Sequence, residues 1–115
     1  MKRLIFVADS HRVLAEFPEA VQRHVGYALY LAQTGGKHLD AKPLKRFAGG
    51  VLEVVSDHSG DTYRTVYTVK LEKAVYVLHA FQKKSKRGIA TPQAEMDLVK
   101  KRLQRAIEID RDLKE

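Results

Sequence analysis

Three stretches rich in β-branched and aromatic residues follow one another in the second half of the chain. They span residues 51–55, 62–71 and 74–81, and only short polar turns separate them. Consecutive strands that are joined by short turns run antiparallel. The sequence therefore predicts an antiparallel β-meander, in which the Val, Tyr and Leu content of residues 74–78 favours a central strand buried on both faces.

Helical patterns flank this meander. Residues 4–7 form a short apolar run typical of a strand, and residues 10–34 then predict two linked helices or one kinked helix, with Pro18 at the break. Their apolar residues recur with a period of 3.6, and Gly35 and Gly36 end the pattern. Residues 35–49 are expected to form a basic loop.

A third helix is predicted after Thr91, which can cap it, with Pro92 in its first turn. Its apolar stripe starts at Met96, and the polar residues placed outside that stripe are Lys100, Lys101, Arg102, Arg105, Asp110 and Arg111. The element order is then β-α-α-β-β-β-α. This is an α+β fold, an antiparallel sheet packed by an N-terminal helical hairpin plus a C-terminal helix, in a single domain over residues 1–115.

The composition limits the possible partners. The chain has 115 residues, 44% hydrophobic and 30% charged, which is typical of a globular protein. Its formal charge of +7 favours a polyanionic partner such as a nucleic acid. It has no cysteine, which excludes disulfides and thiolate metal sites and fits a cytoplasmic location. No apolar run reaches the roughly 20 residues that span a bilayer, so no membrane association is expected.

Cations gather where the last predicted strand ends. Residues 83–87 contain four of them, and Arg64 interrupts an otherwise aromatic and aliphatic strand. A fixed charge beside a basic loop suits a phosphate-rich ligand. Strand alternation places Arg64 on the face opposite Tyr63 and Tyr67, which then pack into the core. The alternative role for Arg64 is a structural ion pair with Glu53 on the neighbouring strand.

His79 is the candidate for proton transfer, because the reference pKa of histidine is near neutral. It lies between Leu78 and Ala80 in the strand, so it faces either the core or the surface, and the alternative is a hydrogen-bonded structural histidine. Phe81 shares its face and could stack on a base. His38 and His58 fall in loops without metal-ligand spacing, so we expect neither a metal nor another cofactor.

Five segments together resemble the RelE/ParE superfamily of toxins, and within it the HigB-like, phage-related branch. They are residues 42–45, 50–53, 63–67, 77–85 and 91–95. The resemblance implies a microbial ribonuclease-like α+β domain that cleaves messenger RNA in the ribosome without a metal. It also implies a cognate antitoxin, often a helix-turn-helix protein.

On this resemblance, the residues expected to be catalytic are Arg64, Lys83, Lys84 and His79. The residues expected to bind RNA are Lys42, Lys45, Arg46, Phe81, Lys86 and Arg87. Some relatives carry a glutamate, a possible general base, where this chain has Lys42, so the acid and base cannot be copied across. Two other functions stay open, namely a ParE-like toxin that targets gyrase and a nucleic-acid-binding module without catalysis.

Overall fold

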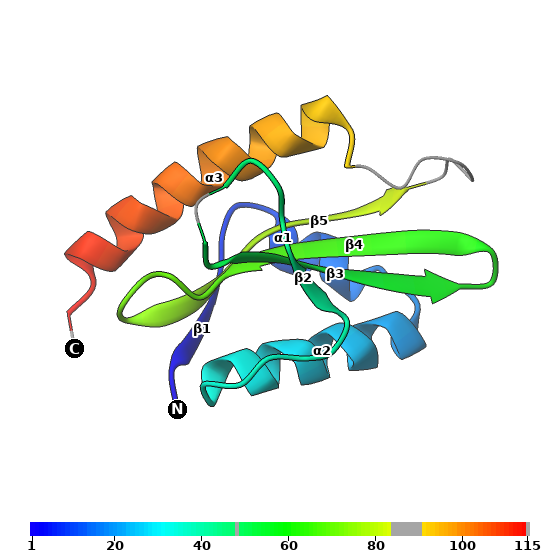
Figure 1. The fold of residues 1–115 in the computed structure, drawn as a ribbon, viewed down its shortest axis with the longest axis horizontal. Coiled ribbons are helices and arrows are strands. Elements are labelled where there is room, and N and C mark those ends of the chain that lie inside the picture. The colour runs from blue at the N-terminus through cyan, green and yellow to red at the C-terminus, as the bar shows by residue number, and fades with distance from the viewer. Residues whose placement is uncertain (48, 84–90, 115) are drawn as a thin grey trace.

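The computed structural model describes residues 1–47, 49–83 and 91–114 (Figure 1). In chain order its elements are β1 (Arg3–Phe6), α1 (Ser10–Ala15), α2 (Glu19–Gln33), β2 (Ala41–Pro43), β3 (Val51–His58), β4 (Asp61–Thr68), β5 (Ala74–Lys83) and α3 (Gln93–Asp112). The α+β class is confirmed, and so is the order of the predicted elements. The one addition is β2, which falls in the stretch expected to be a basic loop.

The five strands form one sheet in the order β1-β5-β4-β3-β2. Neighbouring strands from β2 to β5 are antiparallel, which confirms the predicted meander. β1 instead pairs with β5 in parallel, with Arg3 opposite Ala74. The sheet is therefore mixed rather than wholly antiparallel. The parallel pair is possible because a long crossover connection separates β1 from β5 in the chain.

β2 is a short edge strand, in which Lys42 lies opposite Glu53 and Pro43 opposite Leu52 of β3. Proline has no amide hydrogen, so within a sheet it is tolerated at an edge. Lys42 and Pro43 are both exposed, and a short, charged edge also discourages pairing with other chains. The basic loop expected over residues 35–49 thus contributes a strand to the sheet.

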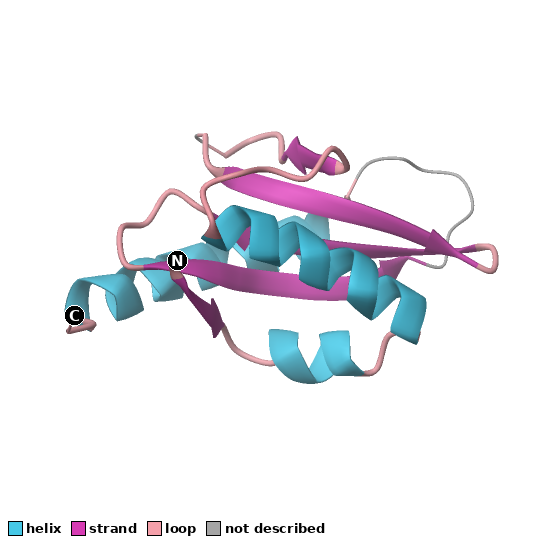
Figure 2. Ribbon diagram, turned by 90° about the horizontal axis from the view of Figure 1, so that it is seen from below, coloured by secondary structure: helices cyan, strands magenta, loops and turns pink. Residues whose placement is uncertain are grey.

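Helices cover both faces of the sheet (Figures 1 and 2). On one face α2 packs Val21, Val25 and Leu29 against a core that contains Tyr63 and Tyr67. On the opposite face α3 contributes a separate core cluster. Every residue of β5 from Ala74 to Phe81 is buried, because this strand lies between β1 and β4 and under helices on both sides. The predicted two-sided central strand is therefore confirmed.

The last turn of α3 is fixed to the sheet through Asp110. Its carboxylate accepts hydrogen bonds from the backbone N–H groups of Glu72 (3.3 Å) and Lys73 (3.0 Å), and from the hydroxyl of Tyr76 (2.8 Å). Burial alone would raise the pKa of Asp110, but these bonds and the charge of Lys73 hold that pKa below its usual value. Asp110 was predicted to lie outside the helix stripe. It is buried instead, because it caps the turn between β4 and β5.

In the part of the chain that the structure describes, no helix has both the length and the apolar character that crossing a bilayer requires.

Candidate nucleic-acid interface

A β-bulge in β5 shapes the face of the sheet that α3 covers. Val66 of β4 lies opposite His79, whereas Tyr67 lies opposite Val77, so Leu78 is the extra residue. Leu78 belongs to the core cluster under α3, and His79 bonds two side chains of that helix. Both consecutive residues therefore face α3, which simple alternation does not produce.

The register of the strands brings the predicted site residues onto this face. Directly opposite residues of neighbouring strands point to the same side of a sheet. Arg64 is paired with Phe81, and Val66 with both His79 and Glu53. Arg64, Glu53, His79 and Phe81 thus share the face under α3, while Tyr63 and Tyr67 pack into the opposite core, as predicted.

Arg64 is buried against Glu53. Its Nη1 donates to Oε1 of Glu53 at 2.8 Å, and both residues are 7% exposed. The structural ion pair considered from the sequence is therefore present. A buried guanidinium beside a carboxylate is held in one orientation, and its planar fork suits phosphate as well as carboxylate.

The other carboxylate oxygen of Glu53 accepts a hydrogen bond of 2.7 Å from the hydroxyl of Thr91. This contact joins the segment before α3 to β3. Thr91 was predicted to cap the helix. The residue at the N-cap is instead Pro92, with no side-chain capping bond, because the Thr91 hydroxyl is used by Glu53.

His79 is buried, with both ring nitrogens bonded. Nε2 lies 2.6 Å from Oε1 of Glu95, and Nδ1 lies 2.9 Å from Nη1 of Arg102. A guanidinium can only donate, so Nδ1 accepts and the ring proton lies on Nε2, which donates to Glu95. The ring also stacks on Phe81, with centroids 5.2 Å apart. The hydrogen bonds considered for His79 are therefore present, and its role in proton transfer stays a prediction.

Arg102 extends this network to the start of α1. Besides His79, it binds the carbonyl of Leu78 at 3.2 Å and pairs with Oδ1 of Asp9 at 2.9 Å. Its side chain is only 13% exposed. Arg102 was predicted to lie outside the helix stripe, and this was wrong because position 102 lies between Val99 and Ala106 on the buried face of α3. Asp9, Glu95 and Arg102 are thus site residues that the sequence interpretation missed.

The predicted cations occupy the border of this face. Lys83, the last residue of β5, lies opposite Thr62 and is half-buried. Lys42 shares a row across the sheet with Glu53, Val66 and His79. The other predicted residues of the basic run, Lys84, Lys86 and Arg87, lie outside the described residues.

Lys45 and Arg46 are exposed in the segment that follows β2. Arg46 has a positive φ of 76° and donates to Oε1 of Gln93 in the first turn of α3. That bond places a cation beside the N-terminal end of α3, so the predicted basic loop lies next to the face that carries Arg64.

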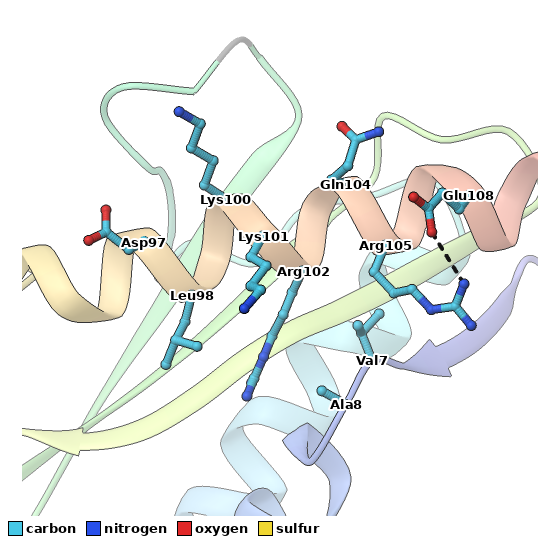
Figure 3. A pocket seen from close by; sticks show the side chains of 10 residues that line it. All are labelled: Val7, Ala8, Asp97, Leu98, Lys100, Lys101, Arg102, Gln104, Arg105 and Glu108. Atoms are coloured by element: carbon cyan, nitrogen blue, oxygen red, sulfur yellow. Dashed lines mark hydrogen bonds and ion pairs between the residues drawn. The ribbon is translucent and has the colours of Figure 1, made fainter.

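A hollow of about 940 Å³ lies between α3 and the segment that joins β1 to α1 (Figure 3). Leu98, Lys101 and Arg102 point toward that segment, whereas Lys100 points away (Figure 3). Arg105 pairs with Glu108 at 3.4 Å at the other end of the hollow. The hollow is thus lined by cations of α3 together with the carboxylates of Asp97 and Glu108.

One group of potential metal ligands occurs among the described residues, formed by His24, His38 and Asp40. His24 bonds Ser56, which pairs with Tyr63 on the α2 face of the sheet. This group is thus separated by the sheet from Arg64 and His79.

The chain matches a known protein family. Residues 12–104 match the model of the family described as Phage derived protein Gp49-like (DUF891). No curated protein and no solved structure matches the chain. The match takes in α2 to β5 and most of α1 and α3, including Arg64, His79 and Glu95. This family is part of the RelE toxin-like superfamily. The chain therefore belongs to the Gp49-like family of phage-derived proteins.

Proposed function

We propose that the protein is the toxin of a type II toxin–antitoxin system, of the HigB-like branch, and that it cleaves messenger RNA on the ribosome. The observation that carries this proposal is Arg64, fixed by Glu53 on the same sheet face as the His79–Glu95 pair. The net charge of +7 and the toxin-like family support it.

Cleavage of RNA by its own 2′-hydroxyl adds negative charge to the scissile phosphate. In our proposal Arg64 binds that phosphate, and Lys83 and Lys84 supply further positive charge. Lys42, Lys45 and Arg46 hold the flanking phosphates, with Lys86 and Arg87 from the basic run. Phe81 contributes a ring beside His79 against which a base can pack.

The 2′-hydroxyl also needs a proton acceptor, and two carboxylates lie on this face. Both oxygens of Glu53 are engaged, one by Arg64 and one by Thr91. Glu95 receives a bond from His79 on Oε1, and its side chain is 29% exposed. We assign Glu95 as the acceptor and His79 as the residue that orients it, since Nδ1 of His79 is already bonded to Arg102.

The proposal includes a protein partner. A cognate antitoxin, of the helix-turn-helix type, would cover the cationic face, and acidic groups on it would complement the +7 charge. Action on the ribosome places the toxin in the cytoplasm.

The test is a cell-free translation reaction with wild type, Arg64→Ala and Arg64→Lys, followed by mapping of messenger RNA ends with and without ribosomes. We expect ribosome-dependent cuts by wild type that fall at least 100-fold in both variants, because lysine lacks the planar fork. Circular dichroism spectra and melting curves establish that each variant is folded. Lys70→Ala, at a surface outside the proposed site, is the matched control and should cut like wild type.

Three results would contradict the proposal. Arrest of translation without cuts would indicate a binding module. Inhibition of gyrase with intact messenger RNA would indicate the ParE-like alternative. Unchanged cleavage by a folded Arg64→Ala would remove Arg64 from the site.

A further inference from the structure

We propose that His24, His38 and Asp40 form a binding site for a divalent transition-metal ion of the Zn²⁺ class. The three side chains come from α2 and from the segment between α2 and β2. They are separated by the sheet from the surface that carries Arg64, so this inference does not depend on the proposed nuclease function.

The ligand atoms are already close together. Nε2 of His24 lies 2.7 Å from Oδ2 of Asp40, and Nδ1 of His38 lies 3.8 Å from the same oxygen. One ligand atom from each residue lies within 4.8 Å of the other two. Zn–N and Zn–O bonds of about 2.0–2.1 Å place tetrahedral ligands about 3.3 Å apart. The two observed distances bracket that spacing, so small side-chain rotations are enough to admit an ion.

The hydrogen bonds around His24 suit this role. Its Nδ1 lies 2.6 Å from the hydroxyl of Ser56, and its Nε2 donates to the carboxylate of Asp40. When an ion takes the place of the Nε2 proton, that proton can move to Nδ1 and be donated to Oγ of Ser56. A ligating histidine in metalloproteins ordinarily has such a partner behind it, and Ser56 is buried at 3% exposure and fixed in place.

The lone pair on Nδ1 of His38 already points toward Asp40. Its Nδ1 accepts the backbone N–H of Asp40 at 2.9 Å, and the ring packs edge-on against His24 with centroids 5.1 Å apart. Binding of an ion would exchange this hydrogen bond for coordination. Tyr27 also packs edge-on against His38, at 5.5 Å between centroids, and limits how far the ring can turn.

The site is open on one side. A hollow of about 380 Å³ is lined by His24, Asp40, Asp57 and His58, among others. Three protein ligands with an open fourth position leave room for a water molecule, or for the imidazole of His58. Two imidazoles with one carboxylate favour Zn²⁺, Co²⁺ or Ni²⁺ over Mg²⁺ or Ca²⁺, which prefer all-oxygen sites.

The experiment measures Zn²⁺ binding by titration calorimetry and Co²⁺ binding by visible absorption, on chelator-treated protein. We expect one ion per chain, and at least tenfold weaker binding in His38→Ala and in Asp40→Asn. Ser56→Ala should weaken binding by about tenfold, because Nδ1 of His24 loses the hydroxyl that orients its ring. His11→Ala is the matched control, since His11 is an exposed imidazole stacked on Phe6, and it should bind like wild type.

A readout that needs no variant is the ¹⁵N spectrum of the histidine rings. One equivalent of Zn²⁺ should shift the ring nitrogens of His24 and His38 and leave those of His11 and His79 in place. Absence of saturable binding by the folded wild type would overturn the proposal, and so would equal binding by folded His38→Ala and Asp40→Asn. If those variants are unfolded, shifts confined to other histidines in the wild type would overturn it.

Discussion

The hydroxyl of Tyr76 donates a 2.8 Å hydrogen bond to Oδ1 of Asp110, and so joins the central strand β5 to the last turn of α3. The same carboxylate also holds the turn between β4 and β5. Although burial works against the charged form, these bonds lower the pKa of Asp110 in the folded protein. A lowered folded-state pKa stabilises the fold above the unfolded pKa, and that contribution is lost as pH falls through the folded value.

We therefore expect Asp110→Ala to lower the free energy of unfolding by about 3 kcal/mol at pH 7, because Tyr76 and two backbone N–H groups lose a charged acceptor. The difference from wild type should shrink as pH falls below about 4, where the unfolded carboxyl is protonated. Urea unfolding at pH 7 and pH 3 measures both. Asp112→Ala, which removes an exposed carboxylate two residues on, should change stability by less than about 0.5 kcal/mol.

Tyr67 and Tyr76 are both fully buried, but their hydroxyl groups differ. The hydroxyl of Tyr67 has no hydrogen-bond partner among the described residues, and burial raises the pKa of Tyr67 to about 12. Removing an unsatisfied buried hydroxyl is favourable, so Tyr67→Phe should stabilise the fold by about 1 kcal/mol. Tyr76→Phe removes the bond to Asp110 and should destabilise it by about 2 kcal/mol. Opposite signs in thermal melts are expected, and a loss of stability in both variants would contradict this account of Tyr67.

The Arg64–Glu53 pair should show strong coupling, because both side chains are buried. Arg64→Met alone leaves an uncompensated buried carboxylate and should cost about 3–5 kcal/mol. The double variant Arg64→Met/Glu53→Gln should be more stable than Arg64→Met. Chemical denaturation of the four proteins in the cycle gives the coupling energy. Additive effects would mean that the two groups do not interact in solution.

The hydrogen bonds of His79 fix its tautomer. Nitrogen NMR should show a protonated Nε2 and an unprotonated Nδ1, since Arg102 can only donate to the latter. In Arg102→Gln, whose amide can either donate or accept, the preference should weaken. A ring protonated on Nδ1 in the wild type would contradict the assignment of His79 as the residue that orients Glu95.

A side chain at positive φ can destabilise the fold through backbone strain and through a steric clash. Gly50 and Gly60 allow these two effects to be measured separately. A Cβ at Gly50, with φ of 93°, would lie 2.6 Å from Cβ of Lys70, whereas nothing lies within 4 Å of one at Gly60, with φ of 84°. Gly60→Ala should therefore cost only the backbone strain, about 1 kcal/mol, and Gly50→Ala about 3 kcal/mol. Equal midpoints of urea unfolding in the two variants would show that the segment at Lys70, just after β4, moves aside.

The periodicity of apolar residues was sufficient to predict the helices and the meander, since each depends on local patterns. Alternation along the strand also placed Tyr63 and Tyr67 correctly on the face of the sheet that Arg64 does not occupy, because β4 alternates regularly up to Val66. Contacts between distant segments were not encoded in any local pattern. The parallel pairing of β1 with β5 and the bulge at Leu78 are of this kind.

Two positions in α3 show how charge can mislead such an interpretation. Arg102 and Asp110 were placed at the surface because they are charged, although they lie on the same helix face as Val99 and Ala106. Asp110 is buried and Arg102 is half-buried, because a partner far away in sequence compensates the charge of each, the β4–β5 turn for Asp110 and Asp9 for Arg102. Such partners cannot be identified from spacing within one helix.

The parallel pairing of Arg3 with Ala74 has a consequence for biosynthesis. β1 is translated before the other strands, but within the described part of the sheet it is bonded only to β5, which follows much later in the chain. Pairing over such a sequence separation is slow, because a large loop has to close before any contact compensates for it. A nascent chain therefore cannot assemble the sheet face that carries Arg64 until β5 has been translated, so the activity proposed above would arise only after that strand has joined the sheet.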